Sequence, residues 1–209
     1  GKDSMFNDFR GFDKNGEAIK ISAPPTLLVS SIGVIPDVTK AVSLDPKMPG
    51  DLIYVLGETK DELGGSEYFD QQGFMGNSIP QVDAQQASKL YRKLTKAIDQ
   101  RLIASCLSPS LGGLGITLAK KAIAGQLGME LDFCKVPFRA DHVLFSESQS
   151  RFVVTLDPKN QEKFETLFED VPFALLGTVT NNNKFTIKDL IDTDIETLNT
   201  HYRKTFKNF

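Results

Sequence analysis

Cysteine and histidine are scarce in this sequence, and their spacing argues against several kinds of site. Only Cys106 and Cys134 occur, and neither belongs to a CxxC pair or a Cys/His cluster. A zinc site or a disulfide framework is therefore not indicated, and a reducing cytoplasm is the natural setting. His142 and His201 stand apart from each other and from the cysteines. Their positions indicate neither metal binding nor a Ser/His/Asp triad.

Excess positive charge and long apolar runs are missing as well. The 24 basic and 27 acidic side chains leave a net charge of −3, which gives no electrostatic footprint for a nucleic-acid backbone. No apolar run approaches the roughly 20 residues that span a bilayer, and the opening GKDSM lacks the apolar core of a signal peptide. We therefore expect a soluble, unexported protein, and the same opening suggests a chain cut from a longer one.

What is present is typical of one compact α+β domain. Hydrophobic residues make up 40% and charged residues 24% of 209 positions, close to the average for globular domains. Apolar and β-branched runs predict strands, and apolar residues at helical spacing predict helices. The expected strands cover 26–35, 51–56, 129–133, 151–156, 173–179 and 184–187. The expected helices cover 84–104, 112–128 and 158–169, with a last helix whose stripe runs from Ile191 to Phe206.

Three polar segments are candidates for chemistry. In the predicted long loop 57–83, Gly64 and Gly65 precede Ser66 and Glu67, so backbone and polar groups can approach a ligand closely. In SCLSPSLGGL at 105–114, Ser110 and the pair Gly112 and Gly113 come just before a helix, where free N–H groups favour anions. In LFSESQSRF at 144–152, a short turn holds Ser146, Glu147 and Arg151. Taken singly, the first two segments are better explained as a Gly-Gly turn and a helix cap, and the third is at least as well explained as a surface ion pair.

Together the segments resemble one family in order and spacing. The blocks GKDSM at 1–5, PPTLLVSSIG at 24–33, PGDLIYVLGETKDELGGSEY at 49–68, GNSIPQVD at 76–83 and LFSESQSRF at 144–152 resemble the phosphoribosylformylglycinamidine synthases. That family lies within the superfamily of aminoimidazole ribonucleotide synthetase, and the resemblance is to its C-terminal type of domain. It implies an α+β fold with a mixed sheet covered by helices, partly ferredoxin-like.

The resemblance also implies a reaction and a site. ATP would phosphorylate the formamide oxygen of formylglycinamide ribonucleotide, and ammonia from glutamine would displace the phosphate, with Mg²⁺ needed in the whole enzyme. The implied partners are the nucleotide-binding domains of the same synthase and a glutaminase domain or subunit. The implied domain covers 1–209, with 1–25 as a lead-in, and the isolated chain is expected to be inactive. The implied substrate- and nucleotide-binding residues are Asp3, Ser4, Gly64, Gly65, Ser66, Glu67, Ser110, Gly112, Gly113, Ser146, Glu147 and Arg151.

The chain departs from the family pattern at the segment 105–120. The pattern SAHDxSDGGLxxxLAE has His, Asp, Asp and Glu where this chain has Leu107, Ser108, Leu111 and Lys120. Because Mg²⁺ prefers carboxylate oxygens, we expect no metal site here. Ser150 replaces a glycine of the last turn, which argues against a positive φ at that position.

Two alternatives to an enzyme domain stay open at this point. The altered segment also suits a non-catalytic scaffold domain that has lost its ligands, or a nucleotide-sensing domain of the same fold.

Overall fold

The computed structural model describes residues 8–22, 28–133 and 138–204, and the chain divides into two compact units, Gly1–Pro36 and Asp37–Phe209. In the first unit, β1 (Asp8–Phe12) and β2 (Ala18–Ser22) form an antiparallel hairpin. The Asp13 carboxylate accepts hydrogen bonds from the N–H groups of Asn15 and Glu17, which closes the turn. The assignment of the whole chain to one domain with a lead-in stays a prediction.

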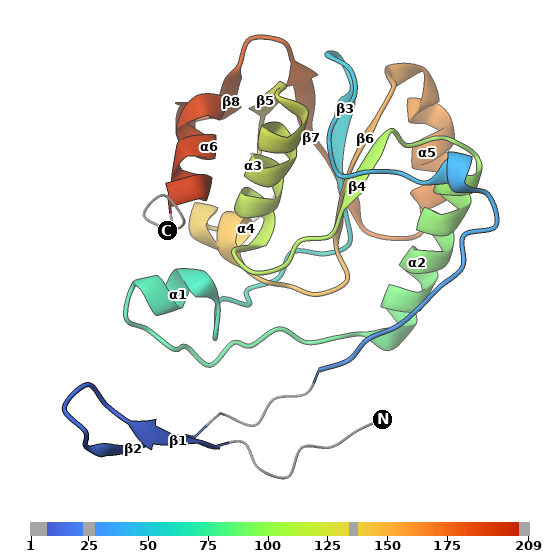
Figure 1. Ribbon diagram of the computed structural model, residues 1–209. Coiled ribbons are helices and arrows are strands. Elements are labelled where there is room, and N and C mark those ends of the chain that lie inside the picture. Colours follow the sequence, from blue (N-terminus) through green and yellow to red (C-terminus); the bar gives the residue numbers. More distant parts are fainter. Residues whose placement is uncertain (1–7, 23–27, 134–137, 205–209) are drawn as a thin grey trace. The chain divides into compact units, whose positions relative to one another are not determined.

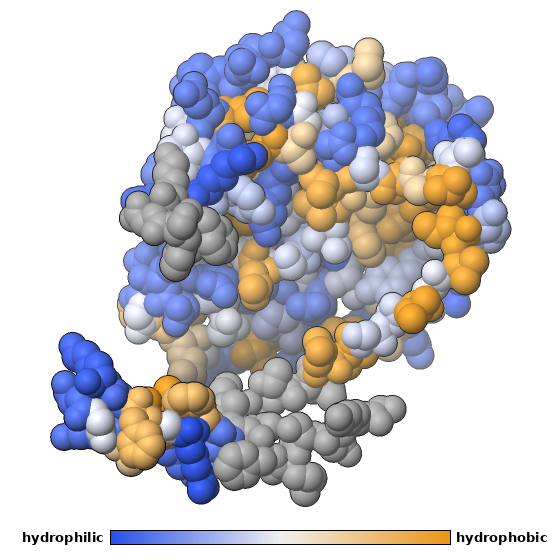
Figure 2. Space-filling model, in the orientation of Figure 1, coloured by the Kyte–Doolittle hydropathy of each residue, from blue (hydrophilic) through white to orange (hydrophobic). Residues whose placement is uncertain are grey.

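One expected strand is wrong. Residues 28–35 form no strand, and Leu28, Val29, Ile32 and Val34 are each at least 77% exposed. Figure 2 shows hydrophobic side chains open to solvent along this segment. The sequence is rich in β-formers, but a strand also needs a neighbour to receive its backbone hydrogen bonds, and no described strand pairs with this segment.

The second unit is built on a seven-stranded mixed sheet (Figure 1). Its strand order is β4-β6-β3-β7-β5-β8-β9, and all neighbours are antiparallel except β5 and β8. The strands are β3 (Leu52–Leu56), β4 (Ser105–Leu107), β5 (Gly128–Leu131), β6 (Phe152–Leu156), β7 (Phe173–Thr180), β8 (Lys184–Ile187) and β9 (Ile191–Asp194).

Helices cover both faces of this sheet (Figure 1). The helices of this unit are η1 (Val38–Lys40), α1 (Glu67–Gln71), α2 (Ala84–Asp99), α3 (Gly113–Gly125), α4 (Ala140–Phe145), η2 (Pro158–Asn160), α5 (Gln161–Phe168) and α6 (Ile195–Arg203). The order β3-α2-β4-β6-α5-β7, with the strands arranged β4-β6-β3-β7, is that of a ferredoxin-like unit. The expected α+β fold is thus confirmed, including its ferredoxin-like part.

Two hydrophobic clusters hold the layers together. Successive side chains of a strand point to opposite faces, so in β3 Ile53 and Val55 join one cluster while Tyr54 and Leu56 join the other. The first cluster includes Leu114 and Leu118 of α3 together with residues of α4 and α6, and the second includes residues of α2 and α5. Both faces of the sheet are therefore buried under helices.

Several predicted boundaries need correction. The helix that begins at residue 84 ends at Asp99 and does not reach 104, because Arg101 has a φ of +55° and turns the chain inward. Ile191 lies in β9, so the last helix begins only at Ile195, where the Asp194 carboxylate caps it. The loop 57–83 contains the short helix α1. Among the described helices none is long and apolar enough to cross a membrane.

A lysine is buried between α3 and the segment that leads into β3. Lys121 has no exposed surface, and its Nζ donates to the carbonyl oxygen of Leu44 and to Ser105 Oγ, each at 2.7 Å. Ser105 Oγ in turn lies 2.7 Å from Thr155 Oγ1. Burial lowers the pKa of Lys121 to about 8, because an ammonium loses its hydration in the interior.

This burial predicts a rise in stability with alkaline pH. Between the folded pKa of about 8 and the ordinary value of 10.5, the unfolded chain binds more protons at Lys121, so the free energy of unfolding increases with pH. We expect a contribution of about 2 kcal/mol between pH 8 and pH 10. Urea unfolding of the chain and of Lys121→Met at both values measures it.

The Lys121→Met variant also provides the control. Every other group titrates in both proteins, so the difference between them isolates the contribution of Lys121 to the pH dependence of unfolding. Burial raises the pKa of the Cys106 thiol to about 11, so that thiol contributes in the opposite direction in each protein. The expected result is a difference between the two proteins that grows with pH. An equal pH dependence would contradict it.

Candidate functional site

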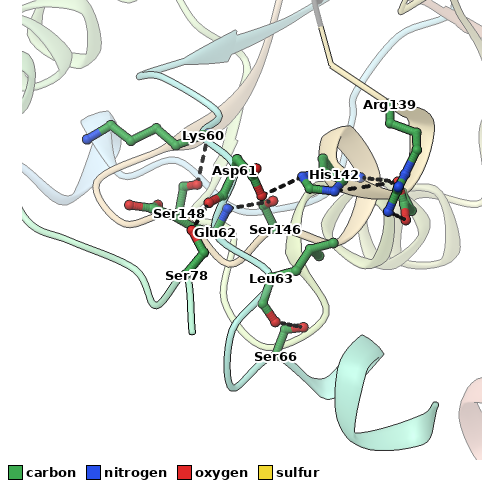
Figure 3. A network of polar contacts seen from close by, with 11 residues as sticks. Lys60, Asp61, Glu62, Leu63, Ser66, Ser78, Arg139, His142, Ser146 and Ser148 are labelled. Atoms are coloured by element: carbon green, nitrogen blue, oxygen red, sulfur yellow. Dashed lines mark hydrogen bonds and ion pairs between the residues drawn. The ribbon is translucent and has the colours of Figure 1, made fainter. Parts of the chain in front are cut away.

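Three of the predicted segments meet at one place, the end of β3. The loop that follows β3, the turn 146–151 before β6, and the start of α3 are joined by side-chain and backbone hydrogen bonds (Figure 3 shows part of the network). These segments lie about 80 and 35 residues apart in the sequence. Each segment is a candidate from its residues alone, and the fold places the three together.

Serine hydroxyls attach the turn to the loop. Ser146 Oγ accepts a hydrogen bond from the N–H of Glu62, and Ser148 Oγ accepts one from the N–H of Lys60 (Figure 3). Both serines are buried. The N–H of Glu147 donates to the carbonyl oxygen of Glu62 at 3.3 Å, so backbone and side chains hold the same contact.

Arg151 lies beneath this contact and is only 1% exposed. Its Nε donates to the carbonyl oxygen of Ser148 at 2.9 Å. One terminal nitrogen donates to the carbonyl oxygen of Ser146 at 2.6 Å, and the other donates to Thr59 Oγ1 at 2.9 Å. Burial lowers the pKa of the guanidinium to about 10, and the nearby Glu62 carboxylate opposes that shift. The geometry shows that Arg151 binds the loop and the turn to each other.

Glu147 joins the remaining two segments through one oxygen atom. Its Oε1 accepts from the N–H of Gly112 at 2.8 Å and from the N–H of Glu67 at 3.0 Å. Gly112 is the N-cap of α3, and that helix has no other side-chain cap among the described residues. A carboxylate of the chain itself therefore occupies the helix start that the sequence analysis assigned to an anion.

Two of the predicted glycines, Gly64 and Gly113, are required because other backbone lies too close for a side chain. A Cβ on Gly113 would lie 2.6 Å from the carbonyl oxygen of Ser146 and 2.8 Å from that of Leu144. A Cβ on Gly64 would lie 2.8 Å from the backbone of Ser78. The N–H of Gly113 donates to the carbonyl oxygen of Ser110, and Ser110 itself is exposed.

Ser66 acts as a helix cap. Its Oγ accepts from the N–H of Phe69 at 3.2 Å, as the N-cap of α1, and donates to the carbonyl oxygen of Leu63 at 2.7 Å. The side chain is 1% exposed. Asp3 and Ser4 lie outside the described residues, so their predicted role stays a prediction.

A hollow of about 210 Å³ opens beside this network. It is lined by the end of β3 and its loop, by the start of α2 and by the turn 149–150, with Glu58, Lys60, Asp83 and Gln149 among the polar residues. Gly64, Gly65, Ser66 and Glu67 do not line it. A ligand in this hollow would meet amide, carboxylate and ammonium groups.

Ser150 corrects one expectation of the sequence analysis. It has a φ of +59°, so the replacement of glycine did not remove the left-handed backbone. Ser150 O lies close to Gly57, which has a φ of +87°, and Tyr91 holds the Ser150 hydroxyl at 3.0 Å. Glycine at position 57 and a side-chain hydrogen bond at 150 together stabilise this conformation.

His142, which its spacing did not indicate as a site residue, also lies here with several acidic residues. His142 Nδ1 is 2.8 Å from Asp61 Oδ1, and Arg139 forms a bidentate pair with Asp141 (Figure 3). Glu62 is 5% exposed, and its Oε2 has no hydrogen-bond partner among the described residues. Only the family block GETKDELGG pointed to this stretch, because Asp61 and Glu62 are far from His142 and Arg151 in sequence.

Curated proteins that resemble this chain include synthase subunits. "Phosphoribosylformylglycinamidine synthase subunit PurL" of Thermococcus sibiricus is 35% identical over 185 residues, which are 85% of this chain and 26% of that protein. The subunit of the same name from Caldanaerobacter subterraneus is 35% identical over 213 residues, 99% of this chain and 28% of that protein. The chain spans about a quarter of the length of these relatives.

Solved structures share the fold. The structure of T. maritima PurL complexed with FGAR superimposes with a TM-score of 0.66 at 17% identity, over 77% of this chain and 30% of that one. E. coli HypE, a hydrogenase maturation protein, superimposes with a TM-score of 0.55 at 15% identity, over 74% of this chain and 51% of that one. Residues 48–189 match the family described as AIR synthase related protein, C-terminal domain. The chain, with its ferredoxin-like sheet and the three segments joined around Glu147, belongs to that family.

Proposed function

We propose that this chain serves as the C-terminal-type domain of a phosphoribosylformylglycinamidine synthase. The complete enzyme would convert formylglycinamide ribonucleotide to formylglycinamidine ribonucleotide, with ATP and with nitrogen from glutamine, in purine biosynthesis. The observation that carries the proposal is the 35% identity to synthase subunits over 85% to 99% of this chain. The convergence of three family segments at the end of β3 supports it.

The remaining parts of the enzyme are proposed partners. Nucleotide-binding domains would supply the ATP and Mg²⁺ sites, and a glutaminase domain or subunit would supply ammonia. A solved assembly described as PurLQS from Thermotoga maritima shares the fold, with a TM-score of 0.62 and 16% identity. The proposed location is the cytoplasm.

The residues of the altered segment do not fit a magnesium ion. Ser108 is exposed and carries no charge, and Leu111 is 63% exposed where the family pattern has Asp. Among the described residues no group of three or more His, Cys, Asp or Glu could hold a metal. We therefore assign no metal-dependent step to this segment, and propose that the chain contributes packing and substrate orientation through the loop after β3.

A graft tests the proposal. In the Thermococcus sibiricus relative, the segment that aligns with this chain is replaced by the chain itself. The product is then measured with ATP and ammonia, so that no glutaminase is needed. We expect product formation, because the relative keeps the domains that this chain lacks. The unaltered relative is the positive control, and the relative without the segment is the negative control.

The graft also separates the enzyme domain from its alternatives. A chimera that unfolds cooperatively but makes no product, together with a 209-residue chain that binds neither formylglycinamide ribonucleotide nor ADP in calorimetric titration, would favour a scaffold domain. Binding of ADP by the 209-residue chain itself, without product formation by the chimera, would favour a nucleotide sensor. We further propose that the isolated chain releases no phosphate from ATP, since the described loops contain no carboxylate cluster to organise Mg-ATP.

A further inference from the structure

A second hollow, of about 630 Å³, lies at the other end of α3 from the network described above. Helices α3 and α6 pack side by side there (Figure 1), and the end of β4 completes the wall. The apolar part is formed by Leu44, Leu107, Ile123 and Ala124, and the cations Lys120 and Arg203 also line the hollow. At 1.5 Å per residue, about 18 Å of helix separates Gly112 from Ala124.

The charges around this hollow are of one sign. No acidic side chain of the described residues lines it, and neither Lys120 nor Arg203 has a carboxylate partner within the described part of the chain. Arg203 uses only Nε, which donates to Asn199 Oδ1 at 2.9 Å. Within residues 8–22, 28–133 and 138–204, its two terminal nitrogens have no acceptor.

Asp45, which follows the lining residue Leu44 in sequence, already has a lysine partner. Asp45 accepts from Lys47 Nζ at 2.6 Å, and hydrogen bonds from Lys47 and Ser43 lower its pKa to about 2. A further cation lies behind the apolar wall, because Lys121 Nζ donates to the carbonyl oxygen of Leu44. Since opposite charge is absent from the lining, the hollow favours an anion.

Two of the lining residues are departures from the family pattern. Leu107 replaces a His and Lys120 replaces a Glu of that pattern. With Glu at position 120, a carboxylate would line the hollow beside Arg203 and the net charge of the lining would fall by two. In this chain the same positions supply an apolar surface and a positive charge.

We propose that this hollow binds a small amphipathic carboxylate. The carboxylate would lie between Lys120 and Arg203, and an aliphatic or aromatic body of about six carbons would cover Leu44, Leu107 and Ile123. The volume falls within the roughly 300–1,000 Å³ of small-molecule sites. Guanidinium and ammonium groups bind carboxylates by charge-assisted hydrogen bonds. The inference goes beyond the proposed synthase role, and does not depend on it.

Three matched probes test the proposal on the whole 209-residue chain. Hexanoate has both the charge and the apolar body, 1-hexanol has only the body, and acetate has only the charge. Binding is followed through the methyl resonances of Leu44, Leu107 and Ile123 in carbon–proton correlation spectra. We expect saturable shifts with hexanoate, about tenfold weaker binding of 1-hexanol, and no saturation with acetate.

Matched variants locate the charge. Lys120→Glu should weaken hexanoate binding at least about tenfold, because it gives Arg203 a carboxylate and repels the ligand. Lys163→Glu makes the same charge change at an exposed position on α5, and should leave the affinity within about twofold. If Lys120→Glu does not fold, the double variant Lys120→Gln and Arg203→Gln replaces it.

Each outcome decides the question. Loss of hexanoate binding in the Lys120 variants but not in Lys163→Glu supports the proposal. Equal affinity for hexanoate and 1-hexanol, equal effects of Lys120→Glu and Lys163→Glu, or shifts confined to methyl groups elsewhere would overturn it.

Discussion

Replacing Arg151 with methionine is expected to destabilise the protein by about 4 kcal/mol. The guanidinium is 1% exposed and donates to Ser146 O, Ser148 O and Thr59 Oγ1. Methionine fills a similar volume but leaves these acceptors without donors, and leaves the buried Glu62 without a nearby cation. Urea unfolding monitored by circular dichroism measures the loss.

Arg92→Met is the matched control for this change. Arg92 lies on α2, is exposed, and has no hydrogen-bond or ion-pair partner within the described ranges. Its replacement should change the free energy of unfolding by less than about 0.5 kcal/mol. A loss below about 1 kcal/mol for Arg151→Met would show that Arg151 does not hold the loop and the turn together.

Gly113→Ala is expected to cost about 3 kcal/mol. Gly113 has a φ of +66°, which disfavours any L side chain, and an added Cβ would meet the carbonyl oxygens of Ser146 and Leu144 at 2.6 and 2.8 Å. Backbone atoms on both sides leave the methyl group no easy relief, so the start of α3 has to move away from the turn. Thermal or urea unfolding measures the cost.

Gly65→Ala separates the two causes. Gly65 has a φ of +69°, nearly that of Gly113, but nothing lies within 4 Å of an added Cβ. Its replacement should cost only about 1 kcal/mol, from the backbone conformation alone. Equal losses for the two variants would mean that the contact with the turn 144–146 contributes nothing.

Most helices and strands that carry a regular spacing of apolar residues are predictable from the sequence. In α2, Leu90, Leu94 and Ala97 recur every three or four residues and face one core cluster, so local reading suffices. The same holds for β3 and β6, where every residue but the first is buried. Their pairing, in contrast, depends on segments about 100 residues apart, which local patterns do not determine.

Two of the strands that the sequence does not mark need a partner strand to exist. β4 is three residues long and pairs with β6, and β8 is the only described strand that pairs with β9. Neither has an apolar run that marks it as a strand. The segment 28–35 shows the converse, because its composition is typical of a strand while no described strand receives its hydrogen bonds.

The sequence indicates which segments form the candidate site, but not what each side chain in them binds. Family blocks identified Ser146, Glu147 and Arg151 as ligand-binding residues. The structure shows that their polar atoms bind the chain itself, and their role toward substrate stays a prediction. Sequence order cannot show that Arg151 is buried, since burial follows from the packing of β6 against β3 and β4.

The Glu147 carboxylate occupies the anion-binding position at the start of α3 and is covalently part of the same chain. Because it belongs to the chain, its effective concentration at the start of α3 does not fall with dilution, and a free phosphate must compete with it. The same oxygen also accepts from Glu67, so a phosphate that displaces it at Gly112 also releases the start of α1. An anion that binds at the start of α3 would therefore compete with the contact between Glu147 and α1, and whatever stabilises that contact would lower the affinity for the anion.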